Sequence, residues 1–77
     1  MITPELVNLG IAFYDALRAG GALDYNARHA AVCYMRRKDA DVGDAMPYYE
    51  ALAYALELRA AAKLKAAARL VIQVPPQ

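Results

Sequence analysis

The sequence has few of the side chains that carry catalysis or bind metals. Its 77 residues include one cysteine, one histidine, one threonine, no serine and no tryptophan. A nucleophile with its base and an orienting group would need His29, Cys33 and an acid such as Asp24 in one pocket. A small, alanine-rich chain leaves little room for a substrate cavity. We therefore expect neither an enzyme nor a cofactor.

Signals for secretion or membrane insertion are also missing. The N-terminus lacks the basic region and apolar segment of a signal peptide. Charged residues interrupt the apolar runs before they reach the roughly 18 residues of a membrane span. The single Cys33 excludes an intramolecular disulfide and fits a reducing compartment. We expect a soluble cytoplasmic protein without a membrane partner.

Apolar residues, in contrast, are abundant and make up 60% of the chain. Much of this fraction is alanine, and each alanine removes little apolar area from water. A chain of this length is close to the size at which burial only just offsets chain entropy. Oligomerisation commonly stabilises so small a core. The net charge of +1 gives no overall attraction to nucleic acid or anionic lipid.

The order of helix signals predicts an all-α, three-helix bundle in a single domain over residues 1–77. Thr3 and Pro4 are a typical helix start, and Gly20 with Gly21 ends a first helix over 4–19. Asp24 is expected to cap a second helix over 25–38. The expected inner faces are Leu6, Leu9, Phe13, Ala16 and Leu17 in the first helix and Ala27, Ala30, Ala31, Tyr34 and Met35 in the second.

The third helix, expected over 47–70 from Pro47 onward, is apolar on almost every side. A helix of this kind is normally covered on more than one side. Two short neighbouring helices cannot cover it, so we expect a helix-mediated homodimer. Residues 71–77 are β-branched and then proline-stopped, which predicts an extended tail. The expected oligomer interface is the stripe formed by Tyr49, Ala53, Leu56, Ala60 and Leu64.

The segment between the second and third helices resembles an EF-hand calcium loop. Asp39, Asp41 and Glu50 occupy positions one, three and twelve of the window DADVGDAMPYYE. However, Gly43 stands where a ligand belongs, and Asp44 stands where the sharp turn needs glycine. We therefore expect an ordinary acidic turn in which Asp44 caps the third helix, without useful calcium affinity.

His29 and Cys33 are four residues apart and share one face of the second helix. This is half of a zinc site by spacing, but zinc takes four ligands and the chain has no other His or Cys. A two-fold axis could bring two such pairs together. The alternative, which we favour, is that Cys33 packs and His29 is partly buried or lies at an interface, with no bound metal.

Binding to nucleic acid is the second function to consider. The Gly20–Gly21 turn and the basic end of the second helix resemble a helix-turn-helix, and Lys63, Lys65 and Arg69 add charge to the third helix. Recognition helices usually read bases from their N-terminal half, which here is Tyr-Asn-Ala-Arg. A small dimeric regulator is therefore the alternative interpretation.

Binding to another protein is the function that the sequence favours. Six tyrosines exceed what so small a core encloses, and tyrosine and arginine are enriched in interface hot spots. Small inhibitors, adaptors and phage anti-defence proteins such as anti-CRISPR proteins are of this size and lack reactive groups. The expected partner-binding face consists of Tyr48, Tyr25, Arg28, Arg36 and Arg37.

Overall fold

The computed structural model describes the backbone of residues 1–73 and the side chains of residues 1–70. Over this range the chain forms three α-helices and no strand: α1 (Pro4–Ala19), α2 (Asp24–Lys38) and α3 (Met46–Gln73). The prediction of an all-helical chain with three helices is therefore confirmed. None of these helices has, within the described residues, a stretch whose length and hydropathy would suit a membrane span.

Local signals at both ends of α1 act as predicted. The Thr3 hydroxyl accepts a hydrogen bond from the Leu6 N–H at 3.1 Å, and Pro4 occupies the first turn. Gly20 is the C-cap, and Gly21 follows with a φ of +97°, a conformation that side chains with a Cβ rarely adopt. These two glycines reverse the chain, so that α2 packs against α1.

The predicted cap of α2 was wrong. The N-cap is Leu23, and Asp24 is the first helical residue. The Asp24 carboxylate instead accepts hydrogen bonds from the Tyr14 hydroxyl and from Arg28 Nε, the latter at 2.8 Å. Asp24 therefore links α2 to α1 rather than capping its own helix.

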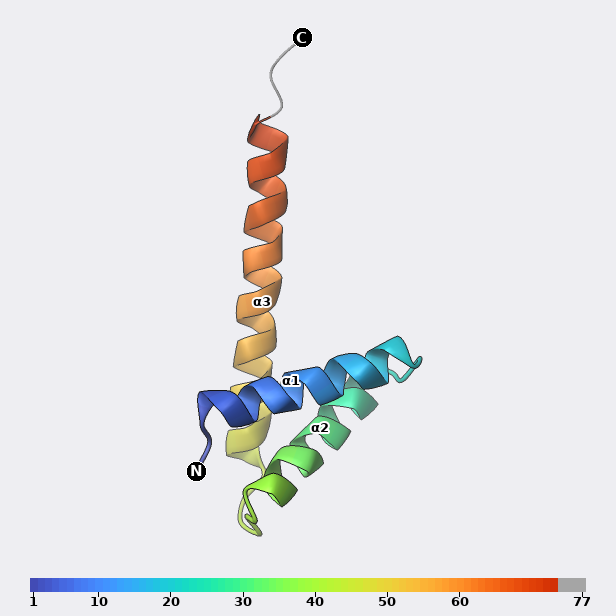
Figure 1. Cartoon of the computed structure of the whole chain (residues 1–77), viewed down its shortest axis with the longest axis vertical. Coiled ribbons are helices and arrows are strands. Elements are labelled where there is room, and N and C mark those ends of the chain that lie inside the picture. The colour runs from blue at the N-terminus through green and yellow to red at the C-terminus, as the bar shows by residue number, and fades with distance from the viewer. Residues whose placement is uncertain (74–77) are drawn as a thin grey trace.

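The three helices do not lie side by side along their full lengths. Figure 1 shows α1 and α2 as a hairpin: α1 crosses the first part of α3, and α2 ends near the start of α3, while the rest of α3 extends well beyond both. The molecule is accordingly elongated, with extents of 59 × 27 × 17 Å. The buried core lies where the helices cross and consists of Leu6, Tyr14, Ala27, Ala31, Val32, Met35, Tyr48, Leu52 and Leu56.

The helices α1 and α2 approach each other closely at Gly10. An ideal Cβ built on Gly10 would lie 2.5 Å from Met35 Sδ and 2.9 Å from Met35 Cγ. Met35 is fully buried. The absence of a side chain at Gly10 is therefore what allows the methionine to fill the space between the two helices. The expected inner face of α1 was wrong at Leu9 and Phe13, which are 45% and 36% exposed, and at Ala16, which is also exposed.

Packing of α3 against the other helices ends at Arg59. This residue forms a bidentate ion pair with Asp15 of α1, with N···O distances of 2.7 and 2.9 Å. Every side chain from Ala60 through Leu70 is exposed, and we call residues 60–70 the arm. The helix includes residues 71–73, so the expected extended tail does not begin at Val71. The rest of that predicted tail, 74–77, lies outside the described residues.

Candidate functional site

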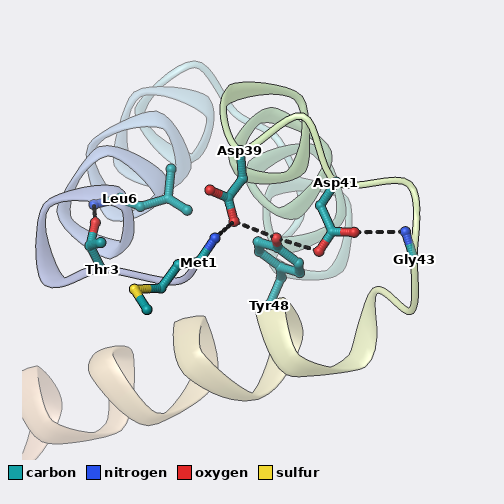
Figure 2. Close-up of polar contacts among 7 residues, drawn as sticks. All are labelled: Met1, Thr3, Leu6, Asp39, Asp41, Gly43 and Tyr48. Atoms are coloured by element: carbon teal, nitrogen blue, oxygen red, sulfur yellow. Dashed lines mark hydrogen bonds and ion pairs between the residues drawn. The ribbon is translucent and has the colours of Figure 1, made fainter.

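The turn between α2 and α3 contains a network of polar contacts (Figure 2). The Tyr48 hydroxyl, from the first turn of α3, lies 2.6 Å from Asp39 Oδ2 and 2.7 Å from Asp41 Oδ2. The other Asp41 oxygen accepts the Gly43 N–H at 2.7 Å, and the Met1 ammonium lies 2.7 Å from Asp39. Figure 2 shows both carboxylates directed towards the tyrosine hydroxyl. The turn is thus held by one aromatic side chain between two acids.

The electrostatic consequences follow from these hydrogen bonds. The Met1 ammonium and then the Tyr48 hydroxyl lower the pKa of Asp39. The Tyr48 hydroxyl, followed by the Gly43 N–H, lowers the pKa of Asp41. The two carboxylates raise the pKa of Tyr48, and Asp39 has the larger effect. Ionisation of the phenol would remove the proton that the hydroxyl donates and would place a third negative charge beside the two acids. The network therefore favours ionised acids and a neutral tyrosine.

The prediction for one residue of the expected partner-binding face, Tyr48, was wrong. Tyr48 was predicted to be an exposed anchor, but only 2% of its surface is exposed. A tyrosine can be buried when its ring packs in a core and its hydroxyl finds a polar partner, and the turn provides two. Tyr48 is therefore a core residue and is not accessible to a partner.

The acidic turn uses its carboxylates for internal contacts. Asp44 Oδ1 accepts the Met46 N–H at 3.0 Å, which confirms the predicted capping of α3. Glu50, expected at the last position of a calcium loop, is exposed on α3. Within the described part of the chain, no group of three or more His, Cys, Asp or Glu side chains is arranged to hold a metal ion.

The other four residues of the expected face are divided between the two ends of α2. Tyr25 is 79% exposed in its first turn, and Arg28 nearby pairs with Asp24. Arg36 and Arg37 lie in its last turn; at 1.5 Å per residue Arg36 is about 16 Å along the helix from Tyr25 and about 12 Å from Arg28. The half-buried Arg36 donates to the Gly43 carbonyl, whereas Arg37 is exposed. These residues do not form one continuous surface.

His29 and Cys33 share a face of α2, as their spacing predicts. Cys33 Sγ lies 3.8 Å from His29 Nε2, and His29 Nδ1 lies 2.7 Å from the Tyr49 hydroxyl of α3. Cys33 also lines an open hollow of about 500 Å³ together with Arg36, Arg37 and the following turn. The contacts orient the imidazole, but His29 is exposed and not partly buried, whereas Tyr49 is half-buried and packs against the core.

The expected oligomer interface is divided by the packing of α3. Leu56 belongs to the chain's own core, with 7% of its surface exposed, and Tyr49 and Ala53 are half-buried. Ala60 is exposed and Leu64 is 73% exposed, both on the arm. Only the C-terminal half of the predicted stripe is therefore free for a second molecule.

One surface was missed by the sequence interpretation. A groove of about 490 Å³ lies between the start of α1 and α3, and Tyr54 and Leu58 on its α3 side are 64% and 53% exposed. A signal was present, because Leu58 is a large apolar residue outside the predicted stripe. The groove is lined by Ile2, Thr3, Pro4, Val7, Asn8, Ala51, Tyr54, Ala55 and Leu58.

Comparisons with known proteins identify no relative of this chain: no family model, no curated protein and no solved structure matches it.

Proposed function

We propose that this protein acts by binding another protein, as an inhibitor or adaptor, in the cytoplasm and without catalysing a reaction. The observation that supports this most directly is the arm, where every residue is exposed, including Leu64 at 73% and Leu70 at 68%. Full burial of one leucine side chain contributes about 1.5–3 kcal/mol. An alanine-rich helix with exposed leucines therefore gains stability when a partner covers it.

A homodimer is part of this proposal. The free half of the predicted stripe, Ala60 and Leu64, continues the i, i+4 row of Tyr48, Leu52 and Leu56 beyond the end of the core, and both residues are exposed. Small residues such as Ala60 allow two helices to approach closely around a leucine. We expect two copies to pack along this side of their arms.

Light scattering at high micromolar concentration tests the dimer. The wild-type chain should have twice the 8.4 kDa mass of one copy, and Leu64→Asp should be monomeric but still helical, because Leu64 contributes little to the core. A wild-type mass of one chain would refute the dimer and leave binding to a different protein as the proposed role.

Affinity purification of the full chain from its native host tests the function itself. We expect a defined protein to co-purify in a stoichiometric amount, to remain bound after nuclease treatment and to lose far less affinity in high salt than a nucleic-acid complex would, since salt does not screen the apolar contacts. Purified partner and purified chain should then form a complex without other components. Failure of the two purified proteins to associate would contradict direct binding.

Nucleic acid is the second candidate. Lys63, Lys65 and Arg69 on the exposed arm support it, because cations on an accessible helix can neutralise phosphates. Affinity for duplex DNA would then fall steeply with salt, and the slope of log affinity against log salt would become shallower by about one for each of these cations replaced. A shallow salt dependence would favour the protein partner.

A further inference from the structure

The groove between α1 and α3 is apolar along most of its length. Ile2, Pro4 and Val7 contribute the α1 side, and Tyr54 and Leu58 stand largely exposed on the α3 side. Thr3, one of its few polar residues, already uses its hydroxyl to cap α1. The groove therefore offers apolar contact area with little competing demand for hydrogen bonds.

The groove continues onto the arm along one side of α3. At about 100° per residue, Tyr54, Leu58, Ala62, Lys65 and Arg69 fall within a sector of about 80°. At 1.5 Å per residue, Lys65 lies about 10 Å beyond Leu58 and Arg69 about 16 Å beyond it. Figure 1 shows α1 crossing α3 just below the part that projects freely, so the groove lies at the base of the arm. We call the groove together with Lys65 and Arg69 the docking surface.

Charge along this half of α3 has one predominant sign. From residue 57 onward α3 carries Arg59, Lys63, Lys65 and Arg69 but only one acid, Glu57. Arg59 is neutralised by Asp15. Within the described residues, no ion pair joins Lys65 or Arg69 to another side chain. The docking surface is thus apolar at its base and cationic towards the tip.

We propose that the docking surface binds an acidic, amphipathic helix of a partner protein. A large apolar side chain of that helix fills the groove beside Tyr54 and Leu58, and carboxylates about two to three turns further along pair with Lys65 and Arg69. This inference rests on the proposed role in protein binding and names the chemical class of the partner and the surface that receives it.

Two other occupants fit the surface less well. The arm of a second copy brings the same cations, so like charges would face one another. The proposed dimer face, Ala60 and Leu64, lies on the opposite side of α3 and leaves Lys65 and Arg69 free. Nucleic acid would satisfy the cations but would leave the apolar groove exposed to water. A helix with an apolar anchor and carboxylates can fill the groove with the anchor and pair its carboxylates with Lys65 and Arg69.

Selection from a displayed library of helical peptides, with apolar and charged positions randomised, tests this inference on the full chain. We expect enrichment of sequences with an aromatic or leucine anchor and with acidic residues two to three turns away. Binding of the best peptide, measured by fluorescence anisotropy, should weaken at least about tenfold with Leu58→Asp and with Lys65→Glu/Arg69→Glu. The substituted residues are exposed, so circular dichroism should show unchanged helix content.

Lys63→Glu is the matched control, because it reverses one cation of the arm on the far side of α3. It should change peptide affinity less than about threefold, consistent with screening of a distant exposed charge. An equal loss with Lys63→Glu, a selection without acidic enrichment, or complete competition by duplex DNA would each overturn the inference. These results concern the docking surface alone. A protein that binds elsewhere on the chain would still be found by affinity purification, so the proposed function could hold even if this inference fails.

Discussion

Replacing Gly10 with alanine tests whether the contact between α1 and α2 is as close as the structure indicates. In the interior of an exposed helix, glycine to alanine stabilises by about 1 kcal/mol. At Gly10 the new methyl group would lie 2.5 Å from Met35 Sδ and 2.9 Å from Met35 Cγ, whereas carbon atoms in contact prefer about 3.5–4.0 Å. The two groups must therefore separate by about 1 Å.

Met35 has little freedom to move away, because it is fully buried where the helices meet. Adding a methyl group to a filled core typically costs about 1–3 kcal/mol. This cost exceeds the gain in helix propensity for most of that range, so we expect Gly10→Ala to lower the free energy of unfolding by about 1 kcal/mol. For a domain of this size the melting temperature should fall by about 4–8 °C.

Urea denaturation followed by circular dichroism measures this change, and two further variants separate its components. Ala12→Gly, at an exposed position of the same helix, reports the propensity term alone. In a Met35→Ala background the steric cost should vanish, and Gly10→Ala should then stabilise by about 1 kcal/mol. If Gly10→Ala alone raises the free energy of unfolding by as much as Ala12→Gly lowers it, the contact at Gly10 is not tight and the argument is refuted.

Two further predictions concern charged contacts. The lowered pKa values of Asp39 and Asp41 mean that their contribution to stability is present above the ordinary carboxyl pKa of 3.8 and is lost as the pH falls below it. Tyr48→Phe should make the decline in stability between pH 5 and pH 3 shallower in urea titrations, and an unchanged slope would contradict the network. The Arg59–Asp15 pair is about one third to one half exposed, so a double-mutant cycle should give a coupling below about 1 kcal/mol that decreases with added salt.

The sequence by itself determined that the chain forms three helices and where α1 begins and ends, whereas α2 and α3 begin one residue earlier than predicted and α3 continues to Gln73. Thr3, Pro4, Gly20 and Gly21 act through hydrogen bonds and backbone conformations that involve only residues near them in the chain. For the same reason Asp44 could be identified as a cap of α3, because it contacts an N–H two residues away. Local interactions of this kind depend on the residue types alone and need no knowledge of the fold.

Which face of each helix is covered was decided by the tertiary structure. The alternation of apolar residues on α3 allows several faces, because alanine makes nearly every side suitable for packing. The face that is covered is that of Tyr48, Leu52 and Leu56, where two leucines bury large apolar side chains and the Tyr48 hydroxyl contacts two carboxylates from the preceding turn. Tyr48 consequently became a core residue although its sequence context suggested an exposed anchor.

The docking surface also depends on tertiary structure. Leu58, Lys65 and Arg69 could be placed on one side of α3 from their spacing, but the groove exists only because the start of α1 lies against that helix. The sequence indicated that two short helices cannot cover all of α3, but only the structure shows that they cover its first part and leave residues 60–70 exposed. Local signals set the bounds of α1, whereas the point at which α3 stops packing against the other helices is set by the crossing of the helices and by the contact of Arg59 with Asp15.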